Sequence, residues 1–343
     1  MAKIYSTKPV KMWIDGTSFN VTKFEKISSI RNNLLKSSDY DFTLSKTDNY
    51  FTTSFQLPSI YYTHLHTFPA LGIKKLEIDT RTAITVPENE DGNIIISGDN
   101  ENDVVNARHF MHSIIGEIRS KLPAAQFISI PVNSEEVQRN FQRFKDEIMN
   151  GDPIEGIHET IFQSPLKLHL TIGVLALMNT LEKEEAVNAL NACKTEVIDR
   201  FITKGNQLKI QVSGINCMND NHSKVNILYA NAKIVQADDE DILQKLANAI
   251  TDYFYNRGLV IQYTDNVKLH VTLMNTKYRK ASTPSTPKKS KWHWKKQSFD
   301  ARSILDKYKD FYFGEKILDS IHLSYMSSKG EDGFYKPLSI IRF

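Results

Sequence analysis

Cysteine is scarce in this chain of 343 residues, which contains only Cys193 and Cys217. Two cysteines form neither a disulfide framework nor the spacing of a metal site, and such usage is typical of a reducing cytosol or nucleus. Long apolar runs are absent as well. The opening residues MAKIYSTKPVKMW lack the apolar core of a signal peptide, and no segment is long enough to span a bilayer. We therefore expect an intracellular soluble protein without membrane contact.

An excess of charge of one sign is also lacking. The 43 Lys and Arg residues nearly balance the 40 Asp and Glu residues, which leaves a formal net charge of +3. A total this small does not indicate nucleic-acid binding, for which only an uneven distribution of the charge could argue. Hydrophobic residues at 41% and charged residues at 24% are those of an ordinary globular protein. The length allows two domains and at least one sizeable core.

The first part of the chain predicts an arm followed by a small domain. Residues 1–49 are polar and irregular, apart from MWIDGTSFNV, which predicts a short hairpin around Asp15 and Gly16. From residue 50 the apolar patterns predict a strand, a helix, two strands and a helix. The corresponding segments are YFTTSFQLP, ALGIKKLEID, TAITVP, NIIISG and DNENDVVNARHFMHSIIGEIRSKL. This β-α-β-β-α order predicts a compact domain at residues 50–121.

From about residue 125 strands and helices alternate only partly. That pattern favours a mixed α+β architecture over a doubly wound sheet. Helices are predicted at 134–149, at about 181–202 and at about 239–257, with apolar residues at helical spacing. The elements surround two matching strands, LKLHLTIGV at 166–174 and VKLHVTLMN at 267–275. We therefore expect two lobes, each contributing one of these strands.

The two matching strands share the frame Lys-Leu-His-apolar-Thr-apolar. Because side chains alternate along a strand, His169 and Thr171 share one face of the first strand, as His270 and Thr272 do in the second. A single H-x-T tripeptide is a weak signal: HET at 158–160 also fits, and IHLS at 321–324 nearly does. One copy alone is typical of a structural strand histidine. Two copies in the same seven-residue frame instead indicate a functional pair.

A pair of histidines suits metal-free cleavage of a phosphodiester. One imidazole takes a proton from the attacking hydroxyl or water, while the other protonates the departing oxygen, and both roles are open because the pKa of histidine lies near neutrality. Thr171 and Thr272 can donate hydrogen bonds to the phosphate oxygens. No cysteine or carboxylate cluster accompanies the histidines in the sequence, so we expect neither a metal nor a cofactor, although a metal stays an alternative. Which histidine is the base stays open.

The paired motifs resemble those of the two-histidine (2H) phosphoesterase superfamily, a bilobal α+β fold with one H-x-T or H-x-S strand per lobe. Three further segments, IFQSPLKLHLTIGVLAL, VKLHVTLMNT and SFDARSILDKYKDFYFG, resemble a family of cointegrator-complex subunits. In that family a KH domain precedes a phosphoesterase domain like that of the A-kinase anchoring proteins. The resemblance runs from about residue 55 to the C-terminus. It implies a KH-like domain at 50–121, a 2H phosphoesterase domain at 125–343, and four catalytic residues: His169, Thr171, His270 and Thr272.

The resemblance also implies a function and a setting. The activity would be that of a phosphodiesterase acting on RNA or nucleotide ends. The partners would be the subunits of a helicase-containing cointegrator complex, which is linked to transcription coactivation and alkylation-damage repair. The resemblance thus implies a nuclear location, to which a cytoplasmic pool could be added. The alternative is a non-catalytic RNA-binding or scaffold subunit, whose histidine cleft binds phosphate without turnover. The intact pair of histidines and threonines favours the enzyme.

The glycine loop of a KH domain is missing. Such a domain carries a G-x-x-G loop whose backbone closes on nucleic-acid phosphates. Here the loop falls on Thr67, Phe68, Pro69 and Ala70, so neither glycine is present. Pro69 lacks an N–H and Ala70 disfavours positive φ, which leads us to expect a KH-like domain without its phosphate grip.

A second basic feature is the segment KYRKASTPSTPKKSKWHWKK at 277–296, which contains no acidic residue. Lysines interleaved with tryptophans suit single-stranded nucleic acid, since the charges meet the backbone and the rings stack on bases. A solvated loop or a nuclear localisation signal is the alternative. The predicted contact residues are Lys288, Lys289, Lys291, Trp292, Trp294, Lys295 and Lys296.

Overall fold

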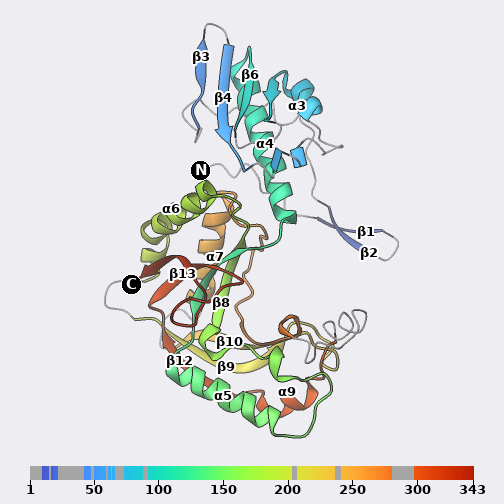
Figure 1. Ribbon diagram of the computed structural model, residues 1–343, viewed down its shortest axis with the longest axis vertical. Helices are drawn as coiled ribbons and strands as arrows, with labels where there is room; N and C mark the ends of the chain where they lie inside the picture. The colour runs from blue at the N-terminus through green and yellow to red at the C-terminus, as the bar shows by residue number, and fades with distance from the viewer. Residues whose placement is uncertain are drawn as a thin grey trace. The chain divides into compact units, whose positions relative to one another are not determined.

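The structure is a computed structural model that describes residues 10–14, 17–21, 42–47, 50–58, 61–62, 64–65, 73–87, 92–202, 207–235, 241–279 and 297–343 (Figure 1). The chain divides into two compact units, Met1–Ile118 and Arg119–Phe343. Within the described ranges, no helix combines the length and the apolar character that crossing a membrane requires.

The first unit contains a hairpin and a four-stranded antiparallel sheet. The hairpin pairs β1 (Val10–Ile14) with β2 (Thr17–Val21), which confirms the predicted strands on either side of Asp15 and Gly16; those two residues lie outside the described ranges. The sheet has the order β3 (Ser45–Thr47), β4 (Tyr50–Gln56), β6 (Asn93–Gly98) and β5 (Ala83–Thr85). The described helices include α3 (Ile73–Thr80) and α4 (Glu101–Lys121), and residues 61–62 and 64–65 before α3 are helical as well. The predicted β-α-β-β-α order is confirmed by β4, α3, β5, β6 and α4.

Strand β3 was not predicted, because it lies in the segment expected to be an irregular arm. Its three residues are all exposed, and they pair only with β4 at the edge of the sheet. A short polar edge strand buries no apolar side chain, so it leaves no alternating pattern in the sequence. Helix α4 buries the apolar residues that fall at helical spacing along it, namely Val104, Ala107, Met111, Ile114, Ile115 and Ile118. Residues 67–70 lie outside the described ranges, and the KH-like assignment stays a prediction.

The second unit is built on one eight-stranded antiparallel sheet. Its order is β12 (Tyr312–Ile317), β9 (Lys209–Cys217), β10 (Ile227–Val235), β11 (Val271–Asn275), β8 (His169–Leu175), β7 (Gln126–Pro131), β13 (Ser320–Tyr325) and β14 (Pro337–Arg342). At the centre, the described register between β11 and β8 consists of one Cα pair, Val271 and Leu170. The sheet therefore has two four-stranded halves with one histidine strand in each, which confirms the predicted bilobal α+β fold.

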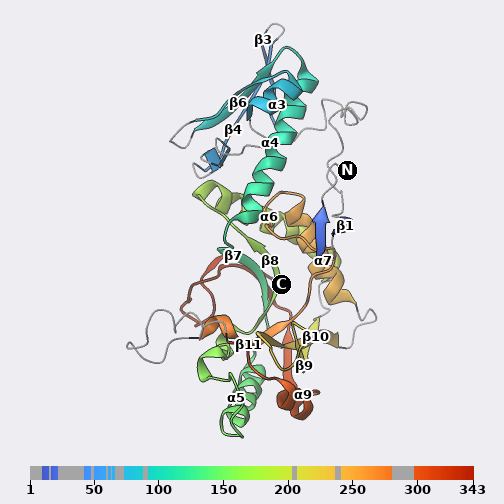
Figure 2. The same cartoon turned by 90° about the vertical axis from the view of Figure 1, so that its right-hand side faces the viewer.

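Helices cover one face of this sheet. α5 (Glu135–Met149) contacts β12, α6 (Thr180–Glu196) contacts β14, and α7 (Ile242–Tyr255) contacts β8 and β10. Figures 1 and 2 show α5 and the short α9 (Arg302–Tyr308) at one end of the unit, with α6 and α7 at the other. Helix α6 ends earlier than predicted, and a 3-10 turn at Ile198–Arg200 follows it. The predicted apolar stripes join one core, to which α5 and α6 contribute Val137, Phe141, Phe144, Ile148, Ala186, Leu190 and Cys193.

A specific contact ties α5 to β12. Ser134 caps the helix, because its Oγ accepts a hydrogen bond from Val137 N at 3.3 Å. The carboxylate of Glu136, in the first turn, accepts a hydrogen bond from Glu315 N at 3.0 Å. Gly314 makes room for this carboxylate, since a Cβ there would lie 2.8 Å from Glu136 Oε2 and its φ is +135°.

Candidate active site

The two histidines of the repeated frame lie at the start of the two central strands: His169 is the first residue of β8, and His270 directly precedes β11. Because Val271 is opposite Leu170 in antiparallel strands, the register sets His169 beside Thr272 and His270 beside Thr171. Leu170 and Val271 are fully buried in the helix-covered core. The four predicted site residues alternate with that core and are half-buried on the opposite face. The structure thus brings both predicted pairs into one group.

Each imidazole is oriented by the backbone of its own strand. His169 Nδ1 lies 2.7 Å from Lys167 O, and His270 Nδ1 lies 2.7 Å from Lys268 O. A carbonyl oxygen only accepts, so Nδ1 carries the proton of each neutral ring and Nε2 carries the lone pair. Thr171 Oγ1 then donates to His169 Nε2 at 3.2 Å. Both halves of the site therefore present the same imidazole nitrogen, held in the same way.

Burial lowers the pKa of both rings. The pKa of His169 is lowered to about 4: desolvation is the largest cause, the hydrogen bond to the Lys167 carbonyl opposes it, and the charge of His270 contributes to the lowering. The pKa of His270 is also lowered by desolvation, against the opposing effect of the Lys268 carbonyl. His169 is the ring held more firmly in its neutral form.

Aromatic side chains explain why the two rings differ. The His169 ring lies among three of them, whereas the Tyr229 ring stands edge-on to His270 with centroids 5.7 Å apart. The side chains around His169 exclude water and so penalise its charged form. Their centroid distances to His169 are 5.1 Å for Phe127, 5.3 Å for Tyr335 and 6.1 Å for Phe334.

This arrangement can perform acid–base chemistry on a phosphate. One lone-pair Nε2 can accept a proton while the other, once protonated, can donate one. Hydroxyl groups from the same two strands lie beside the rings and can donate hydrogen bonds to phosphate oxygens. Among the residues that the structure describes, no group of three or more His, Cys, Asp or Glu side chains could hold a metal ion.

The other sequence signals fall elsewhere. His158, in the third H-x-T tripeptide, caps the 3-10 helix Glu159–Ile161, and its Nδ1 accepts a hydrogen bond from Thr160 N at 3.2 Å. The described hydrogen bonds of His158 fix this turn, and the residue is not part of either central strand. The predicted nucleic-acid contacts from Lys288 to Lys296 lie outside the described ranges.

Sequence reasoning missed the neighbours that complete the site. Ser129 on β7 is opposite Thr171, and Tyr229 on β10 is opposite Thr272. Register shifts occur beside both residues, between Ile128 and Ser129 and between Leu228 and Tyr229. A β-bulge changes which residues meet across strands and has no regular sequence signal, so these neighbours could not be identified in advance.

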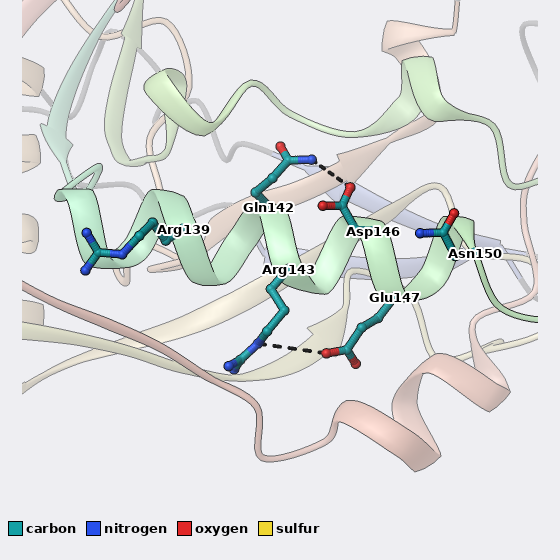
Figure 3. A pocket seen from close by; sticks show the side chains of 6 residues that line it. All are labelled: Arg139, Gln142, Arg143, Asp146, Glu147 and Asn150. Atoms are coloured by element: carbon teal, nitrogen blue, oxygen red, sulfur yellow. Dashed lines mark hydrogen bonds and ion pairs between the residues drawn. The ribbon is translucent and has the colours of Figure 1, made fainter.

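A surface hollow on α5 is separate from this group. Its volume is about 530 Å³, and Figure 3 shows that all six lining side chains come from the helix and the residue after it. They pair with one another: Gln142 Nε2 donates to Asp146 Oδ1 at 2.8 Å, and Arg143 Nε lies 3.8 Å from Glu147 Oε1. Such mutual i, i+4 pairs are typical of a solvated helix face.

Comparison with known proteins identifies the family of this chain. Residues 125–343 match the family described as the AKAP7 2'5' RNA ligase-like domain. Activating signal cointegrator 1 complex subunit 1 of Mus musculus is 34% identical over 312 residues, which cover 88% of this chain and 86% of that protein.

Two solved structures are similar to part of this chain. TT0787 of Thermus thermophilus has a TM-score of 0.39 and 17% identity, and the match covers 64% of this chain and 97% of that one. E. coli LigT in complex with ATP has a TM-score of 0.36 and 14% identity, covering 65% and 99%. The family match and the mouse relative confirm the resemblance inferred from the sequence. The chain belongs to the family of activating signal cointegrator 1 complex subunit 1 and carries an AKAP7 2'5' RNA ligase-like domain at residues 125–343.

Proposed function

We propose that this chain is a metal-independent phosphodiesterase acting on RNA or on nucleotide ends. The observation that carries the proposal is the matched orientation of His169 and His270 on adjacent strands, each with Nδ1 on a backbone carbonyl. This arrangement leaves Nε2 of both rings for proton transfer. The test is turnover of a panel of oligoribonucleotides and cyclic nucleotides by the purified chain with a chelator present.

The difference in pKa assigns roles to the two histidines. His169, whose pKa is lowered to about 4, is the general base, because it is neutral over the working pH range. Its Nε2 takes the proton of the attacking hydroxyl or water as the new P–O bond forms. His270 is the general acid, and its Nε2 protonates the leaving oxygen as the old P–O bond breaks. An anionic phosphate between the rings favours the protonated form that this acid needs.

The threonines stabilise the charge that develops on the phosphate. Thr171 and Thr272 flank the histidines on the same strands. Once a phosphate is bound, their hydroxyls donate hydrogen bonds to its non-bridging oxygens. In a site partly shielded from water, such donors stabilise a transition state more than they would in solution.

The setting of the chain follows from its relatives. The mouse relative is named as a subunit of the activating signal cointegrator 1 complex. We infer that this chain occupies the corresponding place in a nuclear complex with a helicase subunit, acting in transcription coactivation and alkylation-damage repair. The first unit, with its β-α-β-β-α order, would be a KH-like module without a phosphate grip.

The basic segment is proposed to bind single-stranded nucleic acid. Replacing Lys288, Lys289, Lys291, Lys295 and Lys296 by Gln should flatten the salt dependence of binding by the whole chain. The slope of log K against log salt should fall by about 0.7 for each lysine–phosphate pair that the substitutions remove. Replacing Trp292 and Trp294 by Ala should instead lower affinity by roughly 1–3 kcal/mol per stacked base with little change in slope. Binding of a fluorescent oligoribonucleotide over a salt series measures both effects.

The matched control for these lysines lies on the second unit. Lys307 on α9 and Lys309 beyond it are exposed, and their replacement by Gln should leave the salt slope nearly unchanged. An unchanged slope in the five-lysine variant would remove nucleic-acid binding from the role of this segment. The segment would then be a nuclear localisation signal or a solvated loop.

A further inference from the structure

Strand β7 is buried on both of its faces. All six of its residues are buried, although helices cover only the face that carries Ile128 and Ile130. The other face, with Phe127 and Ser129, is the face of the active site. It is covered by the loop between β13 and β14, residues 326–336, which we call the β13–β14 loop.

Phe334 is the side chain of this loop that crosses β7. Its ring centroid lies 6.1 Å from that of His169 and 5.4 Å from that of His322. His169 belongs to β8 on one side of β7, whereas His322 belongs to β13 on the other. The ring therefore bridges the strand between them and, being only 2% exposed, closes that part of the face.

A row of unsatisfied polar atoms lies in the region that Phe334 closes. Ser129 is opposite Thr171 on one side and His322 on the other, so the row continues from the active site. Ser324 follows two residues after His322 and shares its face. Ser129 and Ser324 are fully buried. Among the described residues, Oγ of Ser129, Oγ of Ser324 and Nδ1 of His322 have no hydrogen-bond partner.

Such atoms are costly for a fold to bury. A hydroxyl that loses water and gains no partner forfeits its hydrogen bonds, so natural cores satisfy most of their polar groups. Three unpartnered atoms on one face, two of them in the row with Thr171 and the third two residues along β13, therefore point to a ligand that completes them. The sequence contained one signal of these residues, the near match IHLS at 321–324. A single H-x-S tripeptide is too weak a signal to predict a site.

The β13–β14 loop is held together by hydrogen bonds of its own. Its own hydrogen bonds shape it, with Gly330 N donating to Phe334 O at 2.8 Å and Phe334 N to Asp332 Oδ1 at 2.9 Å. It also contacts the 3-10 helix Pro165–Lys167 that precedes β8, where Lys167 Nζ donates to Ser328 O at 2.7 Å. Lys167 is the residue whose carbonyl orients His169. The position of the β13–β14 loop is therefore linked through Lys167 to the orientation of the His169 ring.

The chemistry of the row indicates an uncharged polar ligand group. Desolvation lowers the pKa of His322, so the row offers two hydroxyls and a neutral imidazole at neutral pH. The charged groups that His322 senses oppose one another: Arg342 and Lys316 lower its pKa, while Asp332 and Asp319 raise it. With strands roughly 4.8 Å apart, the row from Thr171 to His322 spans roughly 10 Å. That length and polarity suit the sugar of a nucleotide whose phosphate lies at Thr171.

We propose that Ser129, His322 and Ser324 form a ribose subsite beside the two-histidine cleft, opened when Phe334 and the β13–β14 loop move aside. The subsite rests on the proposed function, because it needs a nucleotide phosphate in the cleft. Its hydroxyls and imidazole hydrogen-bond a ribose 2'-hydroxyl, which distinguishes RNA from DNA at a given site. The subsite therefore selects ribonucleotides.

Calorimetry with adenosine 3'-monophosphate and its 2'-deoxy analogue tests the subsite, because neither probe contains a phosphodiester to cleave. The wild-type chain should bind the ribonucleotide about tenfold more tightly than the deoxy form. The double variant Ser129→Ala, Ser324→Ala should bind the two equally and keep its affinity for inorganic phosphate. Its melting temperature should not fall, since the removed hydroxyls had no partner among the described residues.

Two further variants make the test specific. Phe334→Ala removes the cover and should strengthen binding of the ribonucleotide more than binding of the 2'-deoxy analogue, which cancels any effect of the lost ring on His169 and the phosphate. Ser303→Ala, at an exposed position of α9, is the matched control and should keep the wild-type preference for ribose.

The outcomes separate the subsite from the proposed function. If the wild type binds inorganic phosphate but binds both nucleotides equally, or if the double serine variant keeps the preference for ribose, the subsite is wrong and the proposed function stands. If the wild type binds neither inorganic phosphate nor either nucleotide, the cleft is no phosphate site and both proposals fail.

Discussion

Replacement of His169 or His270 by alanine should lower phosphodiester turnover by roughly 100- to 10,000-fold in each case. The two rings act as one acid–base unit, so either loss removes most of the rate, and the double variant should be little worse than a single one. Folding should be preserved, because both rings are half-buried and hydrogen-bond within their own strand segments. The measurement is kcat/KM on the panel of oligoribonucleotides and cyclic nucleotides, with a chelator present.

His158 provides the matched control. It belongs to the same kind of tripeptide, but it caps a 3-10 helix, so His158→Ala should keep its turnover. Undiminished turnover in either His169→Ala or His270→Ala would rule out the two-histidine mechanism. Loss of wild-type turnover on adding chelator would instead indicate a metal-dependent reaction.

Replacement of Arg119 by alanine should destabilise the second unit by about 3–5 kcal/mol. The side chains of Arg119 and Glu182 form an ion pair and are only 9% and 7% exposed. The guanidinium also donates to Gly258 O, and the carboxylate accepts from Met178 N at 2.7 Å. Removing the cation leaves a buried carboxylate without the charge that compensates it. Denaturant unfolding followed by circular dichroism measures the loss.

Two comparisons show whether burial causes this loss. Arg143→Ala breaks a pair with Glu147 whose side chains are 58% and 41% exposed, so it should cost less than about 1 kcal/mol. The double variant Arg119→Met, Glu182→Leu should recover much of the stability, because no unpaired charge stays buried. A loss at Arg119 no larger than the loss at Arg143 would contradict this explanation.

Local periodicity made much of the fold predictable. The alternation of the repeated frame placed His169 and Thr171 opposite the buried Leu170, and the structure has this arrangement because a strand has a two-residue period. Helix α5 was predictable for a similar reason, since its buried stripe includes Phe141 and Phe144 at helical spacing. The existence of these elements and their buried faces are therefore local properties of the sequence.

Long-range pairing was not predictable to the same extent. The frame gave no sign that β8 and β11 are neighbours, and the bulges beside Ser129 and Tyr229 decide which side chains meet the threonines. Phe334 reaches the site from a hairpin loop more than a hundred residues after His169. Such contacts depend on register and loop conformation, which a single sequence does not encode in a regular pattern.

The central claim is that His169 and His270 together bind one phosphate. It is tested most directly by NMR titration of the two imidazole Cε1–H signals, with and without inorganic phosphate. Without phosphate, the pKa of each ring should lie below 6.5, as desolvation dictates. Phosphate should raise both pKa values, and His270→Ala should weaken the response of His169. Rings that titrate identically with and without phosphate would contradict the claim.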